Sequence, residues 1–175
     1  MSGRFQNIVM AGIVVLILGG LCGCEKTVPD VDQREAIEAC VQGYLSALAD
    51  AYSDLDTTPL EGWASPQEIA AVRKLLRGLA STGDRVESTL RGIEFENLEI
   101  FREINATVTL VEIWDVVRVD AYTGREKGAN NSSVQNTILQ MRFIDNRWWV
   151  TGRRVIGDGG KPRWNVTTPT PKGTE

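Results

Sequence analysis

Apolar residues recur at intervals of three and four positions in two segments of the first half of the chain, a pattern typical of amphipathic helices. The first segment runs from residue 32 to residue 55, and Asp32 and Glu35 have capping-box spacing, with Asp in place of the usual Ser or Thr. Gly43 lies inside it, where glycine costs about 1 kcal/mol relative to alanine, so we expect another element to approach closely there. The apolar face of this predicted helix comprises Ile37, Cys40, Val41, Tyr44, Leu48 and Tyr52.

The second segment has clearer boundaries. Ser65 is the predicted N-cap and Pro66 the first helical residue, with a glutamate three positions after the cap. Gly83 is placed to end this helix in a left-handed turn. The stretch "DTTPLEGW" between the two segments contains Pro59 and Gly62, which predicts a loop or one irregular turn. The apolar stripe of the second helix comprises Ile69, Val72, Leu75, Leu76 and Leu79.

Enrichment in β-branched and aromatic residues predicts four strands near residues 86–100, 104–119, 134–143 and 147–156. The stretches "FREIN" and "IDNRW" predict tight turns, whereas "YTGREKGANNSS" predicts a longer loop between the second and third strands. Because side chains alternate along a strand, each strand has one predicted inner face. That face holds Thr137, Leu139, Met141 and Phe143 in the third strand, and Trp148, Val150 and Gly152 in the fourth.

In the second predicted strand, the apolar residues shift from even to odd positions along its length. Its first apolar residues occupy even positions and its later ones odd positions. Either a bulge shifts the register near Glu112, or the strand is buried on both faces at its centre. Both alternatives predict a strongly curved sheet. The two sets are Ala106, Val108 and Leu110, then Ile113, Val117 and Val119.

Helices followed by antiparallel strands predict an α+β domain, with two N-terminal helices packed on a curved four-stranded antiparallel sheet. The stretches "ATVTLVEIWD" and "NTILQMRFIDNRWWVTGRRV" resemble the central strand and closing hairpin of the nuclear transport factor 2-like cone folds. The resemblance covers roughly residues 33–156 and extends to the domain of this class at the end of plastid and cyanobacterial division factors. It implies a cone-like fold that hosts isomerases, cyclase-like enzymes and ligand-free scaffolds, so it does not decide the function.

The N-terminus has the order of a secretory signal peptide: one positive side chain, Arg4, then an apolar run from Ile8, then small residues. The run "LCGC" at residues 21–24 resembles the lipobox of bacterial lipoprotein precursors. The resemblance implies that residues 1–23 form a cleaved leader and that Cys24 receives a diacylglycerol and an amine-linked acyl chain. An uncleaved membrane helix is the alternative, but the 17 residues from Ile8 to Cys24 fall short of the roughly 20 that span a bilayer.

Residues 24–31 form a predicted tether, and residues 32–156 the domain. The eight residues from Cys24 to Asp32 reach at most about 28 Å, so we expect the domain to lie close to the lipid bilayer that holds Cys24. Glu25 stands where the inner-membrane retention signal of the enterobacterial type is typically Asp. In a cell with two membranes we therefore expect the outer membrane, facing the periplasm. Residues 157–175 hold four glycines, three prolines and four threonines, and we expect a disordered tail.

Composition narrows the chemistry. The 175-residue chain has a net charge of −4, and loss of Arg4 with the leader makes that of residues 24–175 −5, which argues against nucleic acid or anionic lipid headgroups as the main partner. There is no histidine and, apart from Cys22 and Cys24, the only cysteine is Cys40. A metal or redox site at "CGC" would therefore lack further ligands, and we expect no metal and no cofactor. Cys40 is predicted to be a small buried hydrophobe.

Glu112 is the main candidate for chemistry, because it stands in an apolar run. It is either a desolvated base with a raised pKa, or a carboxylate that is paired with an arginine such as Arg142 or solvated at a bulge. Asp115 and Tyr122 lie nearer a strand end and are predicted at the surface. Three tryptophans either line a hydrophobic pocket or fill the core: Trp63, Trp114 and Trp148.

Trp148 and Trp149 are adjacent and must face opposite sides of a strand. With Trp148 in the core, Trp149 faces outward beside three arginines and forms a candidate partner-binding patch, unless the tail or a second subunit covers it. Those arginines are Arg147, Arg153 and Arg154. The sequence thus favours a non-enzymatic envelope lipoprotein whose domain binds a protein partner or itself. The alternative is a small-molecule-binding protein or enzyme that uses the cone around Glu112 and Trp114.

Overall fold

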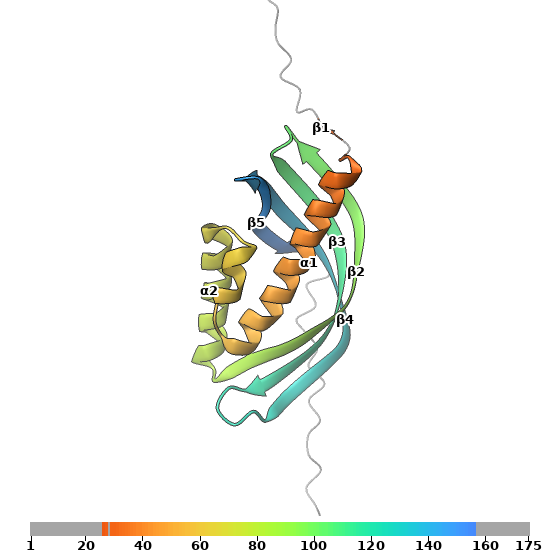
Figure 1. Ribbon diagram of the computed structural model, residues 1–175. Helices are drawn as coiled ribbons and strands as arrows, with labels where there is room; N and C mark the ends of the chain where they lie inside the picture. Colours follow the sequence, from red (N-terminus) through yellow and green to blue (C-terminus); the bar gives the residue numbers. More distant parts are fainter. Residues whose placement is uncertain (1–25, 28, 157–175) are drawn as a thin grey trace, which may run out of the picture.

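Two helices pack on one face of an antiparallel sheet in the computed structural model, which describes residues 26–27 and 29–156 (Figure 1). The helices are α1 (Val31–Asp54) and α2 (Pro66–Ser81), joined through the 3₁₀ helix η1 (Thr58–Gly62). The sheet order is β1-β2-β3-β4-β5, and each strand pairs with its neighbour in the chain. The strands are β1 (Lys26–Thr27), β2 (Asp84–Phe101), β3 (Asn105–Asp120), β4 (Glu126–Ile144) and β5 (Arg147–Val155).

The helix starts follow local side-chain chemistry. The Ser65 hydroxyl accepts a hydrogen bond from the Glu68 backbone amide at 3.4 Å, which confirms the predicted cap of α2. For α1 the predicted cap was wrong, because Asp30 and not Asp32 is the N-cap. Its carboxylate accepts from the Gln33 amide at 2.8 Å, which places Asp32 in the first turn, where its charge favours the positive end of the helix dipole.

Gly43 lies under the ring of Trp63, at the end of η1. A Cβ atom added at Gly43 would lie 2.4 Å from two carbon atoms of that ring. The glycine in the middle of α1 is therefore explained by the close approach of another element, as predicted. Gly83, at φ +68°, follows α2 in the left-handed conformation that was also predicted.

β4 begins eight residues earlier than the sequence predicted, and the predicted long loop is largely strand. The β3–β4 connection is a short turn in which the Asp120 carboxylate accepts from the amides of Tyr122 and Thr123, at 3.1 and 2.9 Å. Further along, the register between β3 and β4 shifts, and the Asp115 carboxylate accepts from the amide of Ser132 at 2.8 Å. Polar residues occupy these irregular positions, so the first half of β4 lacks the alternation of polar and apolar residues from which a strand is predicted.

Register shifts lie near the predicted position, but the faces of β3 do not switch there. Trp114 and Val116 both line a pocket against α1, so the even positions face the helices on both sides of the shift. Only after a further shift between Arg118 and Val119 is an odd-numbered residue of the predicted set, Val119, buried, at 4% exposed. Ile113 lies on the opposite face and is 37% exposed. The even positions of β3 and the inner faces of α1 and α2 form the core, whose largest fully buried side chains include Tyr44, Ile37, Leu45, Leu60, Ile100, Leu110, Leu139 and Met141.

The contact between Gly43 and Trp63 generates a first prediction. Gly43→Ala should destabilise the fold by about 1 to 3 kcal/mol, because the added methyl group overlaps the indole ring. The matched control is Gly78→Ala in α2, where a Cβ atom meets nothing within 4 Å and the better helix propensity should add up to about 1 kcal/mol. Denaturant unfolding of both variants measures the difference. Equal stabilisation by both substitutions would contradict the packing of Trp63 on α1.

Candidate functional site

A buried ion pair lies on the inner face of the sheet. Glu112, on β3, is fully buried, and its Oε2 accepts from Trp114 Nε1 and from Arg153 Nη2, both at 2.7 Å. The same Nη2 atom donates to Gln135 Oε1 at 3.2 Å. Side chains of three adjacent strands, β3, β4 and β5, therefore meet at the Arg153 guanidinium. Of the sequence alternatives, Glu112 takes the form of a carboxylate paired with an arginine, but the partner is Arg153 and not Arg142, which faces outward.

A register shift explains how Arg153 reaches the interior. Val150 pairs with Met141, but Gly152 pairs with the preceding residue of β4, Gln140, so Thr151 is an extra residue in β5. Such a bulge reverses the faces of the residues that follow it. Two predictions were therefore wrong: Gly152 does not share a face with Trp148 and Val150, and Arg153 does not share one with Trp149. Arg154 follows on the outer face and is exposed.

A pocket of about 140 Å³ adjoins this ion pair, between α1 and the sheet. Trp114 and Arg153 line it, but Glu112 does not. In the described part of the chain, Glu112 Oε1, Arg153 Nε and the nearby Thr137 Oγ1 are buried without a hydrogen-bond partner. The remaining lining residues are Leu48, Ala49, Tyr52, Val86, Ser88, Val116 and Gln135.

The two tyrosines of α1 near this cluster are held neutral. Burial, and then the charge of Glu68, raise the pKa of Tyr44, whose hydroxyl donates to Glu68 Oε1 at 2.7 Å. Burial also raises the pKa of Tyr52. Neither phenol would ionise near neutral pH, so neither offers a base beside the pocket.

The three candidate pocket tryptophans do not share one cavity. Trp114 is buried beside Glu112, whereas Trp63 and Trp148 line a separate apolar depression with Cys40 and Phe143. Trp148 is 5% exposed and packs against Phe143, with ring centroids 5.3 Å apart, so it is a core residue. Cys40 donates its thiol to the Trp148 carbonyl at 3.2 Å, and burial raises its pKa to about 11. It is a buried, inert thiol, as predicted.

Trp149 is half-buried on the outer face and is held in place by its neighbours. The Arg147 guanidinium lies 3.8 Å from the centre of the indole ring, and Trp149 Nε1 donates to the Ile144 carbonyl at 3.3 Å. Arg147 also donates to the Gly62 carbonyl. The other arginine next to Trp149 is Arg142, its direct partner on β4. The predicted patch therefore exchanges Arg153 for Arg142.

The two remaining candidates lie at the surface, as predicted. Asp115 pairs with Arg91 at 2.6 Å and binds a backbone amide of the bulge in β4, so it has a structural role. Tyr122 is 88% exposed in the β3–β4 turn.

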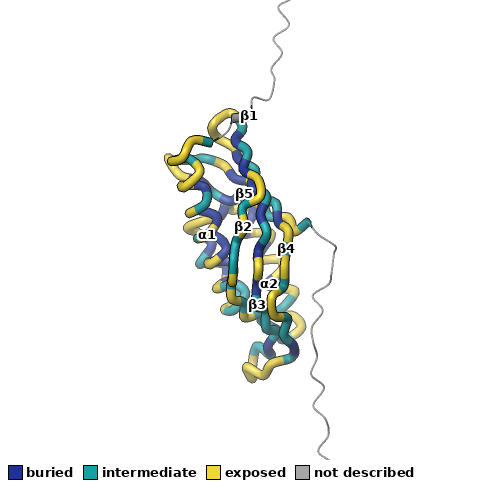
Figure 2. The backbone as a smooth tube through the Cα atoms, turned by 90° about the vertical axis from the view of Figure 1, so that its right-hand side faces the viewer, coloured by how far each residue is buried: buried dark blue, intermediate teal, exposed yellow. Residues whose placement is uncertain are grey.

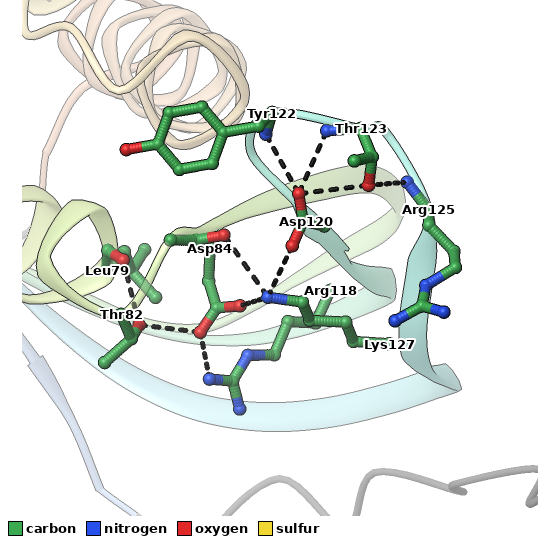
Figure 3. A network of polar contacts seen from close by, with 10 residues as sticks. Leu79, Thr82, Asp84, Arg118, Asp120, Tyr122, Thr123, Arg125 and Lys127 are labelled. Atoms are coloured by element: carbon green, nitrogen blue, oxygen red, sulfur yellow. Dashed lines mark hydrogen bonds and ion pairs between the residues drawn. The ribbon is translucent and has the colours of Figure 1, made fainter.

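A second polar cluster, which the sequence did not predict, joins the ends of β2, β3 and β4 (Figure 3). Asp84 is 1% exposed and accepts from Arg118, from Lys127 at 2.7 Å and from Thr82 at 2.6 Å. Lys127 also pairs with Asp120 at 3.0 Å. Asp84 and Asp120 are direct partners on adjacent strands, so the lysine offsets the repulsion between their carboxylates. This cluster depends on strand register, which the sequence pattern leaves open.

In the described ranges, no group of three or more His, Cys, Asp or Glu side chains is placed to hold a metal ion. Over the same ranges, no helix has the length and apolar character needed to cross a membrane.

The Asp84 cluster generates a prediction about acid stability. Hydrogen bonds from Arg118, then Lys127 and Thr82, hold the pKa of Asp84 well below its ordinary value. A carboxyl group with a lowered folded-state pKa stabilises the protein above its ordinary pKa of about 3.9, and this stability is lost as the pH falls. Asp84→Asn should therefore cost on the order of 1 to 2 kcal/mol at pH 7, and less as the pH falls below about 4.

Denaturant midpoints measured from neutral to acid pH check this prediction. Asp50→Asn, an exposed position on α1, is the matched control and should leave the profile unchanged. An Asp84→Asn profile parallel to that of the unmodified protein would show that the cluster does not stabilise the fold through the charge of Asp84.

No family model matches the chain, and no curated protein matches it either. The structure resembles the crystal structure of the intermembrane space region of the chloroplast protein ARC6, with a TM-score of 0.61 and 14% identity over 74% of this chain and 100% of that one. Two proteins described as having a cystatin-like fold are more distant. One, from Nostoc punctiforme, has a TM-score of 0.45 and 11% identity, over 78% of this chain and 98% of its own. The other, from Caulobacter vibrioides, has a TM-score of 0.43 and 14% identity, over 72% and 91%.

At these identities the likeness to the ARC6 region shows a shared fold alone. The predicted fold class is confirmed: the chain forms an α+β domain with two helices packed on a four-stranded antiparallel sheet, to which β1 adds two residues. The comparisons identify no function.

Proposed function

We propose that this protein is a bacterial envelope lipoprotein, anchored through acylated Cys24, whose domain binds a protein partner or a second copy without catalysing a reaction. The observation that carries the anchor is the lipobox-like run at residues 21–24, directly behind an apolar segment with one positive residue. Residues 1–25 lie outside the described residues. Their role therefore rests on the sequence.

The chemistry of the interior supports a domain without catalysis. A general base must reach a substrate proton, directly or through one water molecule. Glu112 instead accepts from Trp114 and Arg153, and it is absent from the wall of the nearby pocket. Neither Tyr44 nor Tyr52 is a base near neutral pH, because burial raises the pKa of both. On this proposal the sheet wraps α1 as a cone of the nuclear transport factor 2-like kind, filled by side chains.

The second candidate function is a carrier or enzyme for a small molecule. One observation favours it, the pocket of about 140 Å³ beside Trp114 and Arg153. Ligand pockets commonly have about 300 to 1,000 Å³. The pocket beside Trp114 and Arg153 is smaller than this, whereas the apolar depression beside Trp63 and Trp148, of about 580 Å³, falls within the range but is not lined by Glu112. The buried position of Glu112 favours the binding domain over the carrier or enzyme.

In a cell with two membranes, we propose that the lipid anchor is inserted in the outer membrane. Position 25 is Glu, whereas the typical inner-membrane retention signal is Asp at that position. The domain then faces the periplasm. The single cysteine of the domain, Cys40, is buried and makes no disulfide among the described residues, so an oxidising compartment leaves it unpaired.

Substitution of the proposed lipid site tests the anchor. Cys24→Ala should abolish incorporation of a labelled fatty acid, leave the unprocessed precursor and prevent stable membrane attachment through acyl chains, because diacylglycerol transfer requires that thiol. The readouts are fatty-acid labelling and the mass of the product. Cys22→Ala is the matched control and should be labelled and processed normally. Labelling that survives Cys24→Ala but is lost in Cys22→Ala would show that the lipid is on the other cysteine. Labelling that survives in both would remove the proposed anchor.

A further inference from the structure

The described chain begins at one end of the sheet. Lys26 pairs with Phe101 and Thr27 with Ile100, so β1 adds a short edge to the end of β2 next to the β2–β3 turn. Cys24 precedes Lys26 by two residues, which limits the path between them to about 7 Å of extended chain. If Cys24 carries the lipid, as proposed above, this end of the sheet lies at the bilayer surface.

Two turns lie side by side at this end. The β2–β3 turn is joined to the end of β4, just before the β4–β5 turn, by a backbone hydrogen bond of 2.8 Å from the Phe143 amide to the Ile104 carbonyl. A large aliphatic side chain is exposed at each: Ile104, in the β2–β3 turn, is 43% exposed, and Ile144, the last residue of β4 before the β4–β5 turn, is 40% exposed. Figure 2 shows the exposed chain near β1 at this end of the molecule.

An aromatic residue lies at the same level of the sheet. Strand register places Phe101 opposite Asn105, Asn105 opposite Arg142, and Arg142 opposite Trp149. The Trp149 ring is stacked under Arg147, and its Nε1 is bonded to the backbone of Ile144. We call these five residues the tip surface: Ile104, Arg142, Ile144, Arg147 and Trp149.

The charge of this region narrows the kind of partner. Arg102, Glu103 and Asp145 lie in the same two turns, so together with Arg142 and Arg147 the region has three positive and two negative side chains and a net charge of only +1. The tip surface combines two exposed isoleucines with a tryptophan and two arginines. Tryptophan is enriched where an apolar layer meets water, and arginine can keep its charged end in water while its stem lies along apolar groups.

The opposite end of the sheet has a different character. There the Asp84 cluster ties the strands together, and the turn from Asp120 to Arg125 presents Tyr122 among polar residues. β3, with 16 residues, separates the two ends. The exposed isoleucines of the turns therefore gather at the end from which the chain leads to Cys24.

We propose that the tip surface rests on the same bilayer that carries the lipid of Cys24, with Ile104 and Ile144 in the headgroup region and Trp149 at its boundary. This inference rests on the proposed lipid anchor and adds an orientation to it. A bilayer contact made by apolar and aromatic side chains holds the axis of the sheet upright on the membrane and directs the Asp84 end away from it.

A thiol-reactive fluorophore placed at Ile104→Cys tests the contact in the full lipidated protein. The engineered thiol is selective, because Cys24 would be acylated, Cys22 removed with the leader, and Cys40 is buried. In vesicles of phosphatidylethanolamine and phosphatidylglycerol, the fluorophore should emit at shorter wavelength than in water and be quenched by nitroxide-labelled lipid. The matched control is Tyr122→Cys at the opposite end, whose label should be quenched several-fold less.

A second substitution separates the tip surface from the anchor. Ile144→Ser, added to the labelled Ile104→Cys protein, should lower the quenching, whereas Val134→Ser, at an exposed apolar position on the outer face, should not. Equal, weak quenching at both label positions in protein with lipidated Cys24 would overturn the contact and leave the anchor standing. A blue shift that rises with the protein-to-lipid ratio would assign the surface to a second copy and overturn the bilayer as partner. Absence of lipid on Cys24, seen by mass, would overturn the anchor and this inference together.

Discussion

The buried pair of Glu112 and Arg153 is the interaction on which the interior of this domain depends. A carboxylate with no exposed surface is costly to bury, and pairing with a guanidinium and an indole N–H offsets much of that cost. The pair also constrains the chain, because Arg153 reaches Glu112 only if β5 carries an extra residue at Thr151. The ion pair in the core therefore requires the bulge in the edge strand β5.

This arrangement bears on function. Glu112, the carboxylate that the sequence indicated as a candidate base, is paired with Arg153 and does not line the nearby pocket. Trp114 and Arg153 line that pocket, which has a volume of about 140 Å³. The outer surfaces of the domain are the other candidates for function. Those surfaces differ between the ends of the sheet, with a polar cluster around Asp84 at one end and the exposed Ile104 and Ile144 at the other. In the sequence, the lipobox-like cysteine precedes β1, at the apolar end, by two residues.

Local patterns predicted the parts of the fold that local chemistry determines. The two helices, the cap at Ser65, the close approach at Gly43 and the α+β class could all be predicted from spacing and from single residues. Two acidic residues compete for the start of α1, and spacing alone favoured Asp32, although Asp30 makes the hydrogen bond. β4 was predicted too short because polar residues occupy its turn and its bulge.

The candidate site was harder to predict, since it depends on register. Glu112 was found from its apolar surroundings, but alternation along β5 placed Arg153 on the wrong face, and nothing local indicates the bulge at Thr151. The Asp84 cluster was missed for the same reason. Its carboxylate, guanidinium and ammonium groups come from three strands and meet only once those strands are aligned.

A double-mutant cycle on the buried pair tests the central claim most directly, through the free energies of unfolding of Glu112→Gln, Arg153→Met and the combined variant. Each single substitution leaves one buried charge without its partner and should cost about 3 to 5 kcal/mol, whereas the combined variant leaves neither and should be more stable than both singles. Single losses below about 1 kcal/mol that simply add in the combined variant would contradict the account, because Glu112 and Arg153 would then not hold the interior together.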